Sequence, residues 1–172
     1  MDLFYRIVIF LWGLQMLDKI ERWIDQTNIE YKDQRICCDK FSDDFDGFYS
    51  LPFLKKAYYV VVNEIPKPNF YELSEQGLSE FLDMKVDGIT YKNTYYVLPQ
   101  LASNLRLHFH ELVHVAQWSN LGAVKFMQRY INEIQAHGYE EASLEKMAYA
   151  LDAHFSNGGD KIDVVNYVSK KI

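Results

Sequence analysis

The chain has 172 residues, which is enough for one domain with a buried core and too few for two comfortable domains. Hydrophobic residues make up 49% of the chain and aromatic residues 16%, a composition that excludes a disordered protein. The formal net charge of −6 offers no cationic field to phosphate groups, so we expect no nucleic acid among its partners.

The first 26 residues predict one amphipathic helix that packs on the domain. Apolar residues recur at helical spacing from Phe4 to Ile24, and charged residues fill the later turns. The apolar beginning, residues 3–14, is too short to cross about 30 Å of hydrocarbon, and no small-x-small cleavage site follows it. We therefore expect no cleavable signal and no transmembrane span, which slightly favours the cytoplasm. Peripheral membrane contact through this helix is the minority alternative.

Three features follow the first helix. The adjacent pair Cys37-Cys38 rarely reaches disulfide geometry, so no disulfide is expected. Residues 39–47 are acidic and rich in turn formers, which predicts a solvated loop because the spacing of a calcium loop is missing. Aromatic and β-branched residues at 57–62 predict a buried strand, and residues 73–82 predict a short helix capped by Ser74.

A β-hairpin is expected next. Residues 88–91 and 94–98 are rich in strand formers and flank Lys92-Asn93, which suits a tight turn, and Pro99 ends the second strand. Together with the earlier strand, the hairpin gives a sheet region over residues 57–98. If the outer strand borders a cleft, its free backbone groups could bind an extended peptide. An ordinary edge strand is the alternative.

Helices are expected to fill the rest of the chain, over residues 103–120, 123–135, 143–155 and 160–171. Ser103 or Asn104 is the expected N-cap of the first of these helices, and Leu121-Gly122 is its stop. The predicted fold is a single small α+β domain over residues 1–172. It is mainly helical, with a short antiparallel sheet or hairpin before the helices of residues 103–155.

The first of these helices carries the pattern His110-Glu111-x-x-His114. Residues four apart share one face of a helix, so both imidazoles can reach a single ion. A catalytic zinc ion takes three protein ligands and leaves its fourth position to water. Glu111 would then be the general base beside that water. The alternative is an accidental spacing of satisfied or exposed residues, and a third ligand downstream would decide between the two.

Glu145 is our first choice for the third ligand. It begins a helical face that also carries Ala148 and Asp152, and the small alanine would allow close approach to the histidine helix. Asp152 could accept the free ring N–H of a metal-bound histidine. Glu141 and Glu140 are the alternatives, although the helix N-terminus already favours carboxylates there.

The remaining histidines are expected to play no part in the site. His108 lies two residues before His110 and so points away from the shared face, as a core or surface residue. His137 and His154 are expected at helix ends or on the surface.

The segment His110-Glu111-Leu112-Val113-His114, followed by Glu145-x-x-Ala148, resembles the gluzincin branch of zinc metallopeptidases, and most of all their small zincin-like domains. The resemblance covers residues 107–152. It implies Zn²⁺ on His110, His114 and Glu145. The chain departs from the family at Met147, where such domains often carry a second acid, and it lacks a thermolysin-like downstream histidine. Tyr139 or Tyr149 would therefore have to donate to the oxyanion.

The sequence thus predicts a zinc-dependent metallopeptidase that hydrolyses peptide bonds in a peptide or protein substrate, with Glu111 as general base. The alternative is a zincin-fold metal-binding protein, or an inactive domain that binds a peptide or protein without turnover. A membrane-associated domain led by the first helix is a third reading.

Overall fold

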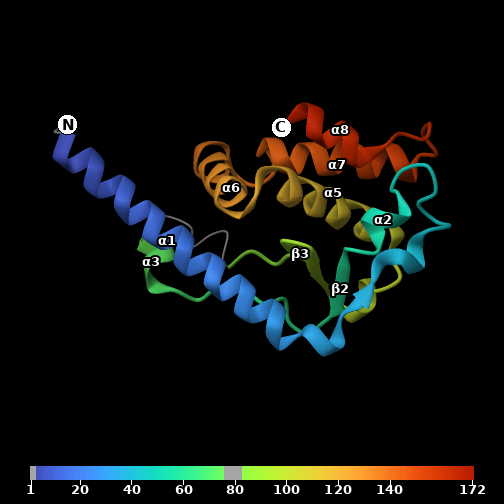
Figure 1. Ribbon diagram of the computed structural model, residues 1–172, viewed down its shortest axis with the longest axis horizontal. Coiled ribbons are helices and arrows are strands. Elements are labelled where there is room, and N and C mark those ends of the chain that lie inside the picture. Colours follow the sequence, from blue (N-terminus) through green and yellow to red (C-terminus); the bar gives the residue numbers. More distant parts are fainter. Residues whose placement is uncertain (1–2, 76–82) are drawn as a thin grey trace.

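The computed structural model describes residues 3–75 and 83–172 (Figure 1). Its helices are α1 (Leu3–Glu30), α2 (Leu51–Leu54), α3 (Tyr71–Glu75), α5 (Leu105–Leu121), α6 (Ala123–His137), α7 (Ser143–Ser156) and α8 (Val164–Lys171). The strands are β1 (Ile36–Cys37), β2 (Tyr58–Val61), β3 (Gly88–Tyr91) and β4 (Thr94–Val97). Short 3-10 helices are η1 (Lys32–Gln34), η2 (Cys38–Phe41) and η3 (Pro99–Leu101). The α+β, mainly helical fold that the sequence predicts is confirmed.

The four strands form one sheet in the order β1-β2-β4-β3. The predicted hairpin is present: β3 and β4 pair antiparallel around a two-residue turn in which Lys92 has φ 61°. The sheet is mixed, however, because β2 pairs with β4 in parallel. This order leaves β3 at the edge of the sheet, next to the helices that follow.

Successive side chains along a strand point to opposite faces of the sheet, and this divides the core into two layers. Tyr59 and Tyr95 are cross-strand partners and pack in the cluster under α5, α7 and α8. Val60 and Tyr96, the next pair, pack on the opposite face with α1. Figure 1 shows this arrangement, with α5 to α8 on one side of the sheet and α1 on the other. Each large side chain buried in this way contributes roughly 1.5–3 kcal/mol of transfer free energy.

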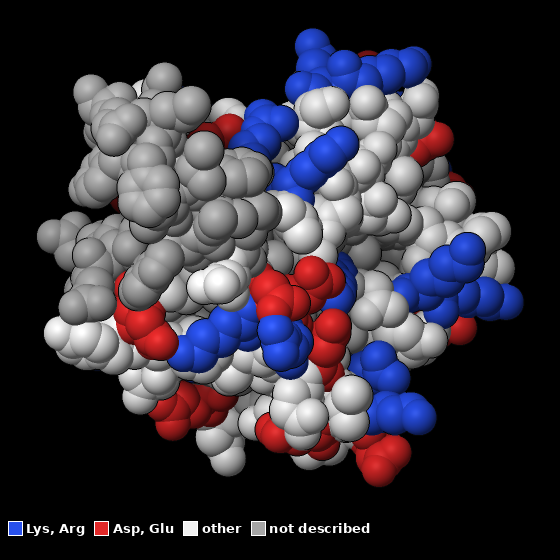
Figure 2. Space-filling model, turned by 60° about the vertical axis from the view of Figure 1, so that its left-hand side comes forward, with Lys and Arg blue, Asp and Glu red and all other residues white. Residues whose placement is uncertain are grey.

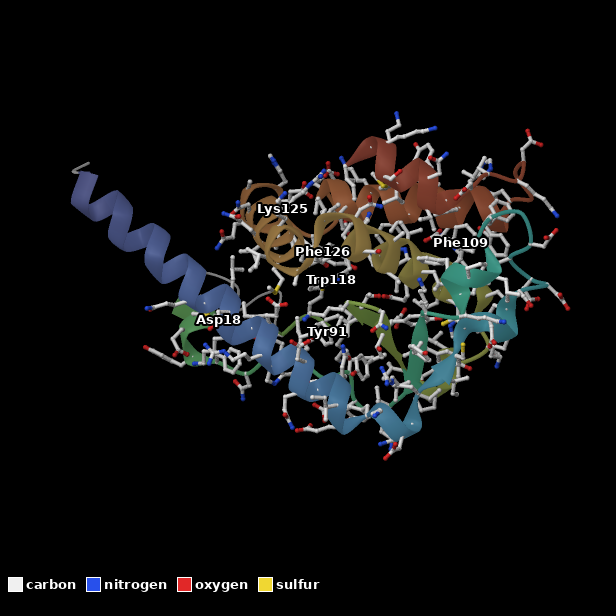
Figure 3. All side chains as sticks on the ribbon, viewed as in Figure 1. Asp18, Tyr91, Phe109, Trp118, Lys125 and Phe126 are labelled. Atoms are coloured by element: carbon white, nitrogen blue, oxygen red, sulfur yellow. The ribbon has the colours of Figure 1, made fainter. Side chains whose placement is uncertain are left out.

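Beyond the free edge of β3, helix α6 packs against α1. Phe126 stacks on Trp118, with 4.1 Å between the ring centroids. Both rings belong to the cluster that also contains Tyr91 of β3. Figure 3 labels these three aromatic residues in the space between α1 and the upper helices. The sheet edge is therefore enclosed by two helices that are far apart in the sequence.

Helix α1 extends one turn beyond its predicted end at residue 26. Thr27, which suggests a break, is buried and donates its hydroxyl hydrogen to the carbonyl of Trp23. Polar contacts fix α1 to the hairpin, since Lys92 pairs with Glu21 and Asp25 on the helix. Among the described residues, no helix combines the length and the apolar character needed to cross a bilayer.

Three local predictions need correction. Helix α3 begins at Tyr71, so Ser74 lies inside it and does not cap it, and residues 76–82 of that predicted helix lie outside the described residues. Helix α8 begins only at Val164 because the Asp163 side chain caps it by accepting from the Asn166 amide. The acidic stretch 39–47 is not simply a solvated loop, since it contains buried phenylalanines.

The charged residues are interspersed on the face that Figure 2 shows, with acidic side chains beside basic ones. Two ion pairs of exposed side chains illustrate this mixing over the surface, Lys161 with Asp46 and Lys146 with Glu141. The described residues on this face form no broad basic area of the kind that holds a nucleic acid backbone.

Candidate metal centre

His110 and His114 lie on the buried helix α5. The Asn104 side chain caps the helix by accepting from the Leu107 amide, as one of the two predicted caps, and Gly122 ends it with φ 74°. Every residue from His108 to Trp118 is buried. The two imidazoles lie one turn apart, and their Nε2 atoms are 3.1 Å from each other.

Glu145, in the first turn of α7, completes the cluster. Its Oε2 atom lies 3.5 Å from Nε2 of His110 and 3.4 Å from Nε2 of His114. Ala148, one turn later, is fully buried, so α7 can lie close to α5, as its size suggested. The three side chains, each offering one ligand atom within 4.8 Å of the others, form a group that could hold a metal ion.

Hydrogen bonds on the far side of each ring fix its orientation. The Nδ1 atom of His110 donates to Oδ2 of Asp152 over 2.9 Å, which is the contact we expected for this aspartate. Nδ1 of His114 donates to Oε1 of Gln117 over 2.8 Å. The amide of Gln117 is itself oriented, because its Nε2 donates to the carbonyl of Leu144. Both Nε2 atoms are therefore left as acceptors.

Three acceptors thus converge in a buried place. Oε2 of Glu145 has no hydrogen-bond partner, and Glu145 is only 1% exposed. A buried carboxylate oxygen without a donor is unfavourable unless a cation compensates it. Two imidazole nitrogens and this oxygen around one point provide a site for such a cation.

The shifted pKa values of the cluster also indicate that a positive charge is favourable here. Burial works to lower the pKa of His110, but the hydrogen bond to Asp152 and the nearby negative charges of Glu145 and Glu111 outweigh it and raise the pKa to about 10. Burial opposes ionisation of Glu145, yet the neighbouring His114 and His110 hold its pKa well below the usual range. Either a proton or a metal ion would satisfy the carboxylates here.

Glu111 is buried beside the cluster and faces the edge strand. The hydroxyl of Thr90 on β3 donates to its Oε2 over 2.6 Å. A Cβ atom built on Gly88, two residues earlier, would lie 2.5 Å from its Oε1. Burial raises the pKa of Glu111 above its ordinary value, although His110, His114 and Thr90 work to lower it. The carboxylate is therefore held between α5 and β3.

The two tyrosines predicted as oxyanion donors border this site. The ring of Tyr149 lies 4.6 Å from the ring of His110, centroid to centroid, and its side chain is partly exposed. Tyr139 and Tyr149 are hydrogen-bond partners of each other. Both line the same polar groove as Glu111.

The two alternative third ligands and the other histidines lie outside the cluster. Glu140 and Glu141 are exposed, and Glu141 pairs with Lys146. His108 points away from the cluster, as expected, and its Nδ1 lies 2.8 Å from the Tyr95 hydroxyl. His137 is exposed at the end of α6, and His154 contacts the carbonyl of Asp160.

Sequence reasoning missed several residues of the site. Tyr130, on helix α6, donates to Oε1 of Glu145 over 2.6 Å. Arg106 donates from Nε to Oδ1 of Asp152 over 2.7 Å. Helical spacing could have found Arg106, which precedes His110 by four residues, and Gln117, which follows His114 by three. No local pattern marks Thr90 or Gly88.

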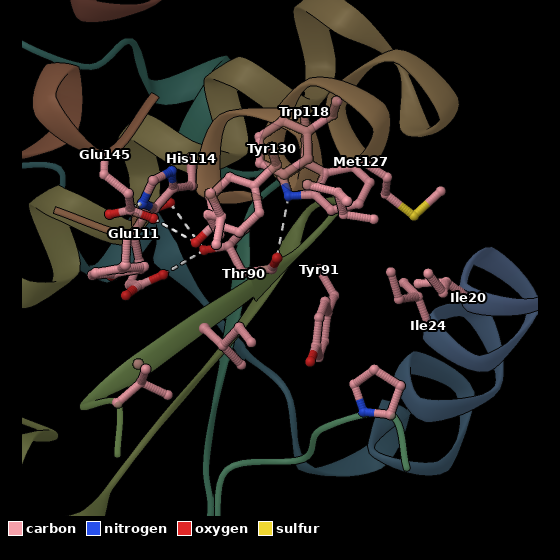
Figure 4. A pocket seen from close by; sticks show the side chains of 18 of the residues that line it. Ile20, Ile24, Thr90, Tyr91, Glu111, His114, Trp118, Met127, Tyr130 and Glu145 are labelled. Carbon is pink, nitrogen blue, oxygen red and sulfur yellow. Dashed lines mark hydrogen bonds and ion pairs between the residues drawn. The ribbon is translucent and has the colours of Figure 1, made fainter. Parts of the chain in front are cut away.

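Two hollows meet at the cluster. One is an apolar pocket of about 110 Å³ between α1, α6 and β3 (Figure 4). The other is a more polar groove of about 280 Å³ that Arg106 and Asp152 help to line. Gly88, Glu111 and Tyr139 line both hollows, so the pocket and the groove adjoin at the general-base candidate.

No family model, curated protein or solved structure matches this chain. The function has to be argued from the chemistry of the site itself.

Proposed function

We propose that this protein is a zinc-dependent peptidase in which His110, His114 and Glu145 hold the metal ion and Glu111 is the general base. The observation that carries the proposal is the convergence of three buried acceptors, one of which, Oε2 of Glu145, lies near both histidines but has no hydrogen-bond partner. Peptide hydrolysis needs a metal site, a carboxylate beside it and room for an extended substrate.

The donor set fits zinc better than the common alternatives. Calcium and magnesium prefer oxygen ligands throughout, whereas two imidazole nitrogens and one carboxylate oxygen match a three-ligand catalytic zinc site. The fixed Nδ1 contacts of both histidines support this choice, because they leave the Nε2 lone pairs directed at the same point. Zinc bound there would polarise a water molecule and the substrate carbonyl.

The side chains around that point would then move the protons. Glu111 would take a proton from the attacking water on its carboxylate and pass it to the departing amide nitrogen. Thr90 supports this role by donating a hydrogen bond that holds the carboxylate, and Gly88 supports it by leaving room for the carboxylate where a Cβ would collide with it. Tyr149, partly exposed beside His110, would donate its hydroxyl to the oxyanion, with Tyr139 behind it.

Metal analysis and peptide cleavage test the proposal together. Purified protein should contain about one zinc ion per chain, lost in His114→Ala and kept in His137→Ala, a control at an exposed histidine outside the cluster. Glu111→Gln should retain zinc and cleave no peptide of an unbiased library that the wild type cleaves. Wild-type protein without zinc would refute the site. Zinc without cleavage would refute the peptidase and favour a metal-bearing domain that binds peptides without turnover.

A further inference from the structure

We propose that the apolar pocket beside the metal cluster receives one bulky apolar side chain of the substrate, of the size of Leu, Ile, Met or Phe, next to the bond that is cut. This inference rests on the proposed peptidase function. It adds that helix α1 builds part of the substrate site.

The lining of the pocket gives its chemistry. Two of its sides are apolar, with Ile20 and Ile24 from α1 and Phe126, Met127 and Ile131 from α6. The polar residues collect at one end, where Glu111, His114 and Glu145 contribute to the wall. Figure 4 shows this division, with Glu111, His114 and Glu145 on one side and α1 on the other. A ligand in the pocket would be apolar and would end at the cluster.

The size of the pocket sets the class of side chain. Its volume of about 110 Å³ is somewhat smaller than the roughly 150 Å³ of an engineered apolar cavity that binds benzene. A branched aliphatic side chain or a single aromatic ring suits such a space. A charged side chain would lose its hydration there without gaining an opposite charge from the α1 and α6 walls.

The neighbouring groove supplies the path of the main chain. It is lined by Lys85, Asn104, Arg106 and Asp152, and it shares Gly88, Glu111 and Tyr139 with the pocket. A peptide lying in this groove would pass Glu111 and could place one side chain into the pocket. Because the pocket begins where the general base lies, that side chain belongs to a residue adjoining the scissile bond.

Helix α1 is fixed firmly enough to act as a wall. Ile24 is 1% exposed, and ion pairs join Lys92 of the hairpin turn to Glu21 and Asp25 on either side of it. The Asn28 side chain further donates to the carbonyl of Tyr91 on β3. The helix therefore contributes more than general packing to the site.

Cleavage-site mapping tests the inference. Zinc-loaded protein is incubated with an unbiased peptide library, and the cleaved bonds are read by mass spectrometry. One position beside the bond should favour Leu or Phe over Ala by on the order of 50-fold, from about three additional buried carbon groups. Ile131→Trp, which fills the pocket, should remove this preference, and Met127→Ala should extend it toward Trp. Val124→Trp, at an exposed position of α6 outside the pocket, is the control and should change nothing.

A binding measurement separates this inference from the peptidase proposal. The methyl signal of ¹³C-labelled Met127, assigned with Met127→Leu, should shift when N-acetyl-phenylalaninamide is added to Glu111→Gln protein, and not with N-acetyl-alaninamide. Cleavage without any apolar preference, and without a methyl shift, would overturn the pocket inference alone. A methyl shift without cleavage would overturn the peptidase and leave the pocket standing. Neither shift nor cleavage would overturn both.

Discussion

Gly88→Ala perturbs Glu111, the proposed general base, and leaves the proposed metal ligands unchanged. Gly88 begins β3 and pairs with Val97, and the absence of a Cβ leaves room for the Glu111 carboxylate. The added Cβ would lie 2.5 Å from Oε1 and 3.0 Å from Cδ of Glu111. The φ angle of Gly88 is outside the positive range that alanine avoids, so the effect is steric and comes from this contact.

The magnitude follows from the distance. Ordinary contact begins at 3.4 Å, so Oε1 has to retreat by about 0.9 Å, which turns the carboxylate and so disturbs the 2.6 Å hydrogen bond that its other oxygen, Oε2, accepts from Thr90. A displacement of about 1 Å in a reacting group can lower a rate by roughly 100-fold. A 100-fold loss lies within the roughly 10²–10⁴-fold rate enhancement that general base catalysis typically contributes. We therefore expect kcat to fall about 100-fold.

The assay measures kcat, KM and zinc content on one good peptide of the library. Zinc content should remain at the wild-type level, because His110, His114 and Glu145 are untouched. Gly13→Ala is the control, since a Cβ at that position on α1 meets nothing within 4 Å and activity should not change. Gly88→Ala protein that keeps its zinc and cleaves at the wild-type rate would refute the role given to Glu111 at this position.

Three further predictions concern the supporting residues. Asp152→Ala should weaken zinc binding about 10–100-fold in a chelator competition, because His110 loses the acceptor of its Nδ1 hydrogen; unchanged affinity would contradict this. Tyr130→Phe should lower the free energy of unfolding of the metal-free protein by about 1–3 kcal/mol, because the buried Oε1 of Glu145 loses its donor. An unchanged midpoint of urea unfolding would contradict this contact. Burial raises the pKa of Cys38 to about 12, so iodoacetamide at pH 8 should leave Cys38 unmodified until the protein is unfolded. Labelling of Cys38 in the folded protein would contradict this prediction.

The sequence predicted best what depends on local periodicity. The spacing of His110 and His114 was enough to place both rings on one face of α5, and the spacing of Glu145, Ala148 and Asp152 was enough to place these side chains on one face of α7. Helix ends marked by a cap or a glycine, such as Asn104 and Gly122, were also predicted well. In these cases the information lies within one or two turns of the chain.

What the sequence could not predict depends on contacts between distant segments. Thr90 and Gly88 contact Glu111 only because β3 lies at the edge of the sheet, and the parallel pairing of β2 with β4 was not evident from either strand. Tyr130 looked like a core residue because its ring is apolar, although its hydroxyl reaches Glu145. Tertiary packing decides which part of such an amphipathic side chain is used.

Zinc content in Glu145→Ala, compared with Glu141→Ala, tests the central claim most directly. Both variants remove a glutamate from the same short region, but Glu141 is exposed and pairs with Lys146, whereas Glu145 carries the buried oxygen that has no hydrogen-bond donor. We predict that Glu141→Ala retains one zinc ion per chain and that Glu145→Ala loses it. Zinc retained in Glu145→Ala, or lost in Glu141→Ala, would contradict the metal site proposed for this protein.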